Sequence, residues 1–129
     1  APKVRSSHTP VIRIQRGTVC LADLNPPKGT EPGKIRPVLV VQTDLLNGHH
    51  PSTLVCPLTT SVKRSAKHLR VHLSRNQAGL DKDSDVMIDQ LRAIDNRRMI
   101  KALGSVSEPV MQQVSENLAI ILDLLIGTE

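Results

Sequence analysis

Residues 25–37 read NPPKGTEPGKIRP and lead directly into the apolar run VLVVQ at residues 38–42. Four prolines and two glycines keep the first segment out of regular helix and strand. It nevertheless carries four charged side chains, which are Lys28, Glu31, Lys34 and Arg36. Because prolines lower the conformational entropy that a loop loses on ordering, a charged group at the base of such a loop can be held close to one geometry. The sequence therefore predicts a stiff, charged loop before a buried strand, with Arg36 at its base.

Short apolar runs separated by turn signals recur on both sides of this loop. The first predicted strand begins at Thr18. The following predicted strands cover residues 38–44, 53–60, 68–74, 85–95 and 98–106. The pair Asn47-Gly48 is a strong turn signal between two of them. Alternation in the run HLRVHLS places Leu69, Val71 and Leu73 on one face of a strand. The pattern indicates roughly six or seven short strands joined by turns.

The last segment of the sequence has helical periodicity. Ser107 is a good N-cap, Pro109 suits the first turn, and Gly127 is a natural stop. The apolar stripe of this predicted helix is formed by Val110, Val114, Leu118, Ile121 and Leu125. Strands followed by one amphipathic helix indicate a small, mostly antiparallel barrel or α+β domain.

The composition is that of one globular domain with a basic charge. Of 129 residues, 39% are hydrophobic and 22% charged, and the formal net charge of +5 favours a polyanionic partner. The sequence contains no Phe, Tyr or Trp, so the core must consist of Leu, Ile, Val, Met and Ala. RNA-recognition modules that stack bases on aromatic rings are disfavoured for the same reason.

Signatures of metal sites and of common enzyme classes are missing from the sequence. There is no CxxC, HExxH, GxSxG or glycine-rich phosphate loop, so we expect no metal and no cofactor. Cys20 and Cys56 lie in apolar runs and are expected to be buried free thiols. His68 and His72 stand four apart on a predicted strand, where that spacing does not bring two side chains onto one metal ion.

The first residues differ in charge from the rest of the chain. Residues 1–15 contain basic but no acidic side chains, and we expect a flexible basic arm before a single domain at residues 16–129. No signal-like segment and no apolar run of about 18 residues is present, so we expect a cytoplasmic protein with no membrane partner.

An ordered set of motifs spans residues 16–60 and resumes at residues 89–95. The first part comprises Arg16-Gly17, Asp23-Leu24, Pro26, Gly29, Glu31, Gly33, Arg36-Pro37, the VLVVQ run, Asp44, Asn47 and PLTT at residues 57–60. The second part is DQLRAID. This set resembles the MazF/PemK (Kid) toxins of bacterial toxin–antitoxin systems.

The resemblance implies a fold, an activity and partners. The fold would be mostly β (α+β), a small SH3-like antiparallel barrel of the CcdB/MazF type with a C-terminal amphipathic helix, forming a homodimer. The activity would be metal-independent, sequence-specific cleavage of single-stranded RNA, chiefly mRNA. The 2′-hydroxyl would attack the adjacent phosphate, leaving a 2′,3′-cyclic phosphate and a 5′-hydroxyl. A cognate antitoxin with an acidic, disordered segment would occupy the RNA groove.

The resemblance also implies site residues. The family's arginine before proline falls on Arg36, and its threonine at a strand end falls on Thr59, so these two form the expected catalytic pair. The expected RNA-binding residues are Glu31, Gly33, Lys34, Asn47, His49, His50, Thr60, Asp89 and Gln90. Neighbouring strand residues point to opposite faces, so only one of the two threonines reaches the phosphate, and the register from Arg36 favours Thr59.

The chemistry of these residue types agrees with the expected reaction only in part. RNA supplies its own nucleophile, and Arg36 can donate to two phosphate oxygens at once, so we expect an electrostatic clamp. Neither arginine nor a threonine hydroxyl is suited to proton transfer near pH 7. Asp89, His49 and His50 therefore stay open as proton carriers, and Thr59 is expected to position the substrate.

Three positions depart from the family pattern. Thr18 and Cys20 replace an acidic residue and an aromatic, and Met87 stands where some members have an arginine. A mechanism that uses that arginine does not carry over to this chain. Two alternatives therefore stay open. One is a CcdB-like gyrase poison that shares the fold class without cutting RNA, and the other is a noncatalytic SH3-like RNA-binding module.

Overall fold

The structure, a computed structural model, describes residues 12–30 and 33–124. The strands are β2 (Thr18–Asp23), β3 (Ile35–Val40), β4 (Ser52–Thr59), β5 (Arg70–Leu73), β6 (Ser84–Met87), β7 (Arg92–Asp95) and β8 (Met99–Ser105), and the helix is α1 (Glu108–Ile121). Two 3-10 turns, η2 (Ile88–Gln90) and η3 (Asn96–Arg98), flank β7. Glu31, Leu125, Gly127 and the predicted arm up to residue 11 lie outside the described residues, and the domain boundary at residue 16 stays a prediction.

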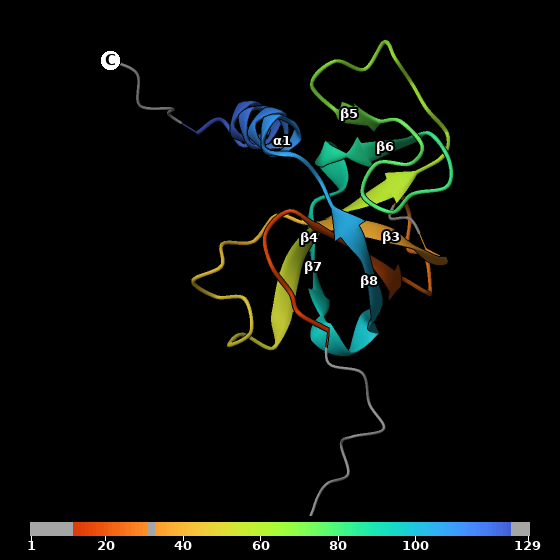
Figure 1. Ribbon diagram of the computed structural model, residues 1–129. Helices are drawn as coiled ribbons and strands as arrows, with labels where there is room; N and C mark the ends of the chain where they lie inside the picture. The colour runs from red at the N-terminus through yellow and green to blue at the C-terminus, as the bar shows by residue number, and fades with distance from the viewer. Residues whose placement is uncertain (1–11, 31–32, 125–129) are drawn as a thin grey trace, which may run out of the picture.

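The strands form one seven-stranded antiparallel sheet with the order β5-β6-β4-β3-β2-β8, and β7 also pairs with β4. Figure 1 shows α1 beside β5 and β6, away from the end of the sheet that holds β7. The predicted mostly antiparallel fold with a C-terminal helix is confirmed. The sheet is not closed into a barrel, because β5 and β8 form its two edges in the described part of the chain.

Two details of the predicted strands are wrong. The predicted strand at residues 85–95 is divided by η2 into β6 and β7, because these segments pair with different parts of β4. β6 pairs with Leu58 and Thr59, at the end of β4, whereas β7 pairs with its first four residues. Leu69 precedes β5 and is 42% exposed, so it does not share the buried face of Val71 and Leu73.

Buried side chains form two clusters on opposite faces of the central strands. Val19 and Leu39 belong to the cluster that includes Val114 of α1, whereas the adjacent Cys20 and Val38 belong to the other cluster. Because successive strand residues point to opposite faces, this alternation explains why the central strands are apolar almost throughout. Both thiols are free and buried as predicted, and burial raises the pKa of Cys56 to about 12.

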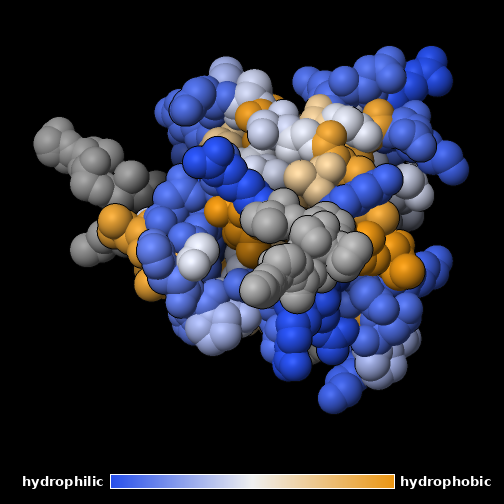
Figure 2. All heavy atoms as spheres, turned by 60° about the horizontal axis from the view of Figure 1, so that its bottom comes forward, coloured by the Kyte–Doolittle hydropathy of each residue, from blue (hydrophilic) through white to orange (hydrophobic). Residues whose placement is uncertain are grey.

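Several large apolar side chains remain at the surface. At the end of α1 these are Ile120, Ile121, Leu122 and Leu124, and in the turn after β3 they are Leu45 and Leu46. Figure 2 shows hydrophobic residues of one face in separate patches among polar residues. Among the described residues, no helix is long and apolar enough to cross a membrane.

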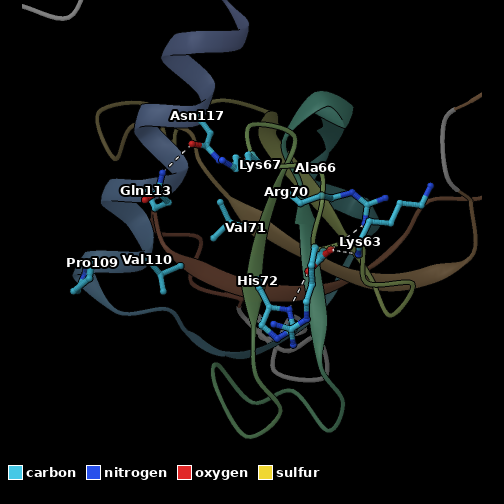
Figure 3. A pocket seen from close by; sticks show the side chains of 12 residues that line it. Lys63, Ala66, Lys67, Arg70, Val71, His72, Pro109, Val110, Gln113 and Asn117 are labelled. Carbon is cyan, nitrogen blue, oxygen red and sulfur yellow. Dashed lines mark hydrogen bonds and ion pairs between the residues drawn. The ribbon is translucent and has the colours of Figure 1, made fainter.

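The helix begins where the sequence predicts. Ser107 is its N-cap, and the hydroxyl accepts a hydrogen bond from the amide of Val110. Val114 and Asn117 are its buried residues, and Figure 3 shows Val110 and Asn117 on the side of α1 that faces Val71 of β5. The helix thus covers the edge of the sheet at β5, and a loop of charged residues lies beside it.

Candidate active site

The two ends of the proline-rich loop are tied together by hydrogen bonds. The amide of Leu24 donates to the carbonyl of Lys34 at 2.8 Å, and the amide of Lys34 donates to Oδ1 of Asn25 at 2.7 Å. Nη1 of Arg98 donates to the carbonyls of Asp23 and Asn25, at 2.9 and 2.8 Å. The loop therefore leaves β2 and enters β3 through a closed stem, which fixes the backbone two residues before Arg36.

A close approach inside the loop requires glycine at residue 33. A Cβ atom there would lie 2.6 Å from Cδ of Pro27, closer than real side chains approach. The carbonyl of Gly33 in turn accepts a hydrogen bond from Nε of Arg36 at 3.0 Å. The loop thus supplies both the restraint on the backbone and one anchor for the arginine side chain.

Arg36 is held at a second point by the neighbouring strand. Its Nη1 donates to the carbonyl of Leu58 on β4 at 3.1 Å. The side chain is half-buried, and this burial lowers the pKa of the guanidinium below its usual range. Arginine keeps its charge at neutral pH despite such a shift. Two of its five N–H groups have these fixed partners, so the remaining donors can bind an anion.

Thr59 lies on β4, the strand next to that of Arg36. β3 and β4 pair Val38 with Pro57, and extending this antiparallel register by two residues sets Arg36 opposite Thr59. Directly opposed residues share a face, with Cβ atoms roughly 5 Å apart. Oγ1 of Thr59 accepts a hydrogen bond from the amide of Ser61 at 3.1 Å, so its own proton is free for donation.

These residues line a groove of about 380 Å³, which we call the catalytic groove. Its lining comprises Lys34, Ile35, Arg36, Pro37, Leu58, Thr59, Thr60, Ser61 and Ser84. The structure therefore brings together Lys34, Arg36, Thr59 and Thr60 of the predicted site, and Gly33 contributes its carbonyl. Ser61 and Ser84 were not predicted, although Ser61 follows the threonine pair directly.

An adjoining hollow of about 460 Å³ continues the catalytic groove. The two share Pro37, Thr60 and Ser84, and the second adds two cations and one carboxylate, which are Lys82, Lys101 and Asp81. Its lining also contains three leucines, which are Leu21, Leu80 and Leu103. Positive charge beside an apolar wall suits a ligand that has both anionic and flat apolar parts.

The predicted residues of the turn before β4 lie away from this groove. His49 and His50 are exposed and precede β4, whereas Thr59 is its last residue. An eight-residue strand spans about 25 Å, so these histidines cannot contact a phosphate held by Arg36 of the same chain. Asn47 is buried, and its amide donates to the carbonyl of Gln42 and to Oδ1 of Asp44, which fixes the turn.

The remaining predicted residues are also outside the lining of the catalytic groove. Asp89 and Gln90 lie on η2, where Asp89 is exposed and Gln90 half-buried. Glu31 lies outside the described residues. Roles for these residues in RNA binding stay predictions.

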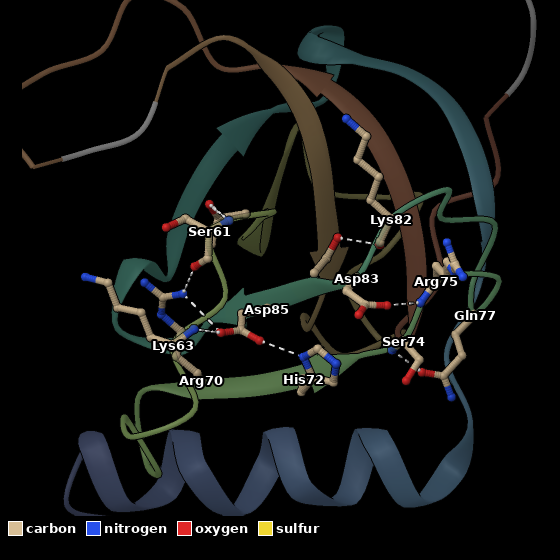
Figure 4. Close-up of polar contacts among 12 residues, drawn as sticks. Ser61, Lys63, Arg70, His72, Ser74, Arg75, Gln77, Lys82, Asp83 and Asp85 are labelled. Atoms are coloured by element: carbon tan, nitrogen blue, oxygen red, sulfur yellow. Dashed lines mark hydrogen bonds and ion pairs between the residues drawn. The ribbon is translucent and has the colours of Figure 1, made fainter.

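Asp85, which no sequence motif singled out, lies next to Thr59 of the predicted catalytic pair. The strand register pairs it with Thr59 on β4 and with His72 on β5. Its carboxylate is 1% exposed and accepts hydrogen bonds from the amide of Lys63 at 2.8 Å and from Nη1 of Arg70 at 3.2 Å. Nδ1 of His72 lies 3.0 Å from its other oxygen (Figure 4). The only signal in the sequence is an acidic residue at the start of an apolar run.

Thr59, Asp85 and His72 are directly paired across β4, β6 and β5, and extending the β3–β4 register adds Arg36 to the same row. Neighbouring strands lie about 4.8 Å apart, so the row is about 14 Å long. All four side chains are on the same face of the sheet, because directly opposed residues share a face.

The chain matches a known protein family over most of its length. The model of the family described as PemK-like, MazF-like toxin of type II toxin-antitoxin system matches residues 15–122. The chain belongs to this family. The predicted resemblance to MazF/PemK toxins is therefore confirmed.

Individual MazF proteins are similar over most of the chain. Endoribonuclease MazF of Staphylococcus epidermidis is 36% identical over 111 residues, which are 86% of this chain and 92% of that protein. MazF (Form-I) from Deinococcus radiodurans has a TM-score of 0.77 at 24% identity, covering 88% of this chain and 100% of that chain. The MazE-MazF complex (Form-II) from the same organism gives a TM-score of 0.72 at 25% identity, over 89% of this chain and 100% of that chain.

One departure from the MazF pattern has a clear structural consequence. Met87, where some MazF-like toxins have an arginine, is 8% exposed at the end of β6 and does not line the catalytic groove. This chain therefore has no second guanidinium at that position, and Arg36 is the arginine that lines the groove.

Proposed function

We propose that this toxin is a metal-independent endoribonuclease that cleaves single-stranded RNA, chiefly mRNA in the cytoplasm. The observation that carries the proposal is that Arg36 and Thr59 line one groove, with Arg36 anchored at Nε and Nη1. The name of the relative from Staphylococcus epidermidis, an endoribonuclease, supports the same reaction class.

In the proposed reaction the RNA supplies the nucleophile. The 2′-oxygen forms a bond to the adjacent phosphorus and loses its proton, while the bond from phosphorus to the 5′-oxygen breaks and that oxygen gains a proton. The products are a 2′,3′-cyclic phosphate and a 5′-hydroxyl. The free donors of Arg36 neutralise the charge that develops on the phosphoryl oxygens, and such preorganised donors are usually the largest catalytic contribution.

Thr59 has a supporting role in this mechanism. Its hydroxyl accepts from the amide of Ser61 and can donate to a phosphoryl oxygen opposite Arg36. The two residues then bind the same phosphate from two strands, which restricts its orientation.

Proton transfer in this mechanism requires groups other than Arg36 and Thr59. Asp89, His49 and His50 do not line the groove of their own chain, so a second copy would have to bring any of them there. In a homodimer, the partner chain could place one of these three side chains at the groove. The exposed apolar residues at the end of α1, Ile120 and Leu122 among them, support self-association.

An antitoxin partner is part of the same proposal. One solved relative is a MazE-MazF complex, and another is described as an endoribonuclease in complex with its cognate antitoxin from Mycobacterial species. The net charge of +5 suits both an RNA substrate and an acidic, disordered antitoxin segment.

The test is incubation of the purified chain with a long single-stranded RNA in EDTA, followed by analysis of the product ends. We expect cleavage with cyclic-phosphate and 5′-hydroxyl ends, and no cleavage of the same RNA carrying 2′-O-methyl groups. Intact RNA would support a gyrase poison of the CcdB type. RNA that is bound with a steep salt dependence but never cut would support a noncatalytic binding module.

A further inference from the structure

A third hollow, of about 580 Å³, which we call the basic pocket, lies between the loop after β4, the strand β5 and α1. Four cationic side chains from that loop and from β5 line it, namely Lys63, Arg64, Lys67 and Arg70. Figure 3 shows Lys67 between the loop and Asn117 of α1, with Val71 below it. The proposed reaction does not use this pocket.

The charges around the basic pocket are not balanced by its own residues. Asp85 is the one acidic side chain in the lining, and it is already paired with Arg70 at 3.2 Å. Lys63, Arg64 and Lys67 are exposed, and within residues 12–30 and 33–124 none of them forms an ion pair. Three like charges around one hollow repel one another and attract an anion.

The basic pocket and the catalytic groove lie close together. Thr59 lines the groove, Asp85 and His72 line the pocket, and these three are consecutive members of the row across the sheet. The chain itself connects the two sites, because residues 60 and 61 line the groove and residue 63 lines the pocket. Four residues span at most about 14 Å, so Lys63 cannot lie farther than this from Thr59.

Asp85 holds the connecting segment in place. Its Oδ2 accepts from the amide of Lys63, and Nη1 of Arg70 also donates to the carbonyl of Ser61 at 3.0 Å. The segment that joins the two sites is therefore attached to the sheet at both ends, and the spacing between groove and pocket is fixed.

We propose that the basic pocket binds a backbone phosphate of the RNA strand on one side of the scissile phosphate. This rests on the proposed function, because it assumes that the catalytic groove holds RNA. An RNA strand seated at Arg36 carries further phosphates at regular intervals along this surface. Arg64 can bind one with two parallel hydrogen bonds, and the lysines add point charges. The closeness of the pocket to the groove favours RNA over an acidic protein segment as the ligand.

The test measures binding rather than cleavage. A long single-stranded RNA with 2′-O-methyl groups throughout keeps every phosphate but has no free 2′-hydroxyl, so it stays intact. Its affinity is measured over a range of salt concentrations for the wild type, Arg64→Glu and Arg13→Glu. Arg13 is an exposed arginine beside Asp44 and Asn47, at the other end of β4, and its replacement changes the net charge equally.

Arg64→Glu is expected to weaken binding about 10-fold or more and to reduce the slope of log affinity against log salt by about 0.7 for each phosphate that the variant no longer binds. Arg13→Glu should change affinity by only a few-fold through net charge. Lys67→Glu, at a second exposed position, should repeat the result of Arg64→Glu. Equal effects of Arg64→Glu and Arg13→Glu would overturn the proposal.

Two further outcomes separate this inference from the proposed function. In the first, the wild type cleaves unmodified RNA, but Arg64→Glu and Arg13→Glu have the same affinity for methylated RNA. This result rejects the phosphate site in the basic pocket and leaves the nuclease proposal intact. If the wild type cleaves nothing but Arg64→Glu selectively loses binding, the site stands and the nuclease proposal fails. A polyglutamate peptide is tested in parallel, and selective loss of its binding with unchanged RNA binding would overturn the inference in favour of an acidic protein ligand.

Discussion

Arg36 on β3 and Thr59 on the adjacent strand β4 line the same groove, and Nη1 of Arg36 donates to the carbonyl of Leu58, the residue directly before Thr59. This bond ties the arginine to the strand that carries its partner. A displacement of either strand end would therefore move both groups together. The catalytic geometry depends on the β3–β4 ladder as much as on the loop.

Loss of the Thr59 hydroxyl should impair cleavage while the fold is retained. Thr59→Val keeps the shape of the side chain but removes the group that accepts from Ser61 and donates to the phosphate. We expect the cleavage rate to fall about 100-fold, the lower range for one donor in such a site. Thr59→Ser, which keeps the hydroxyl, is the matched control. A Thr59→Val protein that cleaves RNA at the wild-type rate would exclude the proposed role.

Arg98 should affect cleavage without touching the substrate. Arg98→Ala removes two hydrogen bonds from the loop stem and allows the loop to move relative to β3. Because catalysis depends on the position of Arg36, we expect kcat to fall about 10-fold or more with a smaller change in KM. The control is Arg97→Ala at the adjacent residue, which breaks only an exposed pair with Asp95. Equal kcat values for the two variants would show that the stem does not position Arg36.

Asp85 should be more important for stability than a typical surface carboxylate. Asp85→Ala removes the common partner of Arg70, His72 and the amide of Lys63, and leaves a largely buried guanidinium without its charge partner. Breaking a buried pair in this way costs about 3–5 kcal/mol of unfolding free energy. Denaturant unfolding measures this, with Asp95→Ala as the control at an exposed pair. A variant of Asp85 as stable as the control would contradict the structure.

The buried thiol of Cys56 should make stability depend on alkaline pH. Burial raises its pKa from an ordinary value of 9.0 to about 12 in the folded protein. The unfolded chain therefore loses this proton first, and the free energy of unfolding should fall as the pH rises from about 9 to about 12. Cys56→Ala removes this contribution and should show a shallower decline than the wild type. Identical pH slopes for the two proteins would mean that the thiol is not buried as described.

Much of the fold and the centre of the site could be predicted from local sequence features. Pro37 and the apolar run after it place Arg36 at the start of a strand, and the turn at Asn47-Gly48 makes the next strand antiparallel to it. The hydrophobic pattern of the two strands then restricts their register. The pairing of Arg36 with Thr59, in contrast, was expected from the resemblance to the MazF/PemK toxins.

The positions of Asp85 and His72 beside Thr59 depend on pairing between strands that are distant in the sequence. Asp85 and Thr59 are separated by the whole loop after β4 and by β5, and no local pattern specifies their register. The same limit explains the division of residues 85–95, because η2 forms where the partner segment of β4 changes. His49 and His50 were expected near the site from the resemblance, but β4 separates them from Thr59 by its full length.

The central claim is that Arg36 stabilises the charge on the scissile phosphate, and the most direct measurement is the single-turnover cleavage rate of Arg36→Ala on a long RNA in EDTA. The account predicts a fall of about 100- to 1,000-fold, with an unfolding midpoint close to that of the wild type. Arg36→Lys should recover little of the rate, because an ammonium lacks the planar fork in which Nε and Nη1 bind Gly33 and Leu58 while two further N–H groups can bind a phosphate side by side. A folded Arg36→Ala protein that cleaves RNA at the wild-type rate would contradict the account.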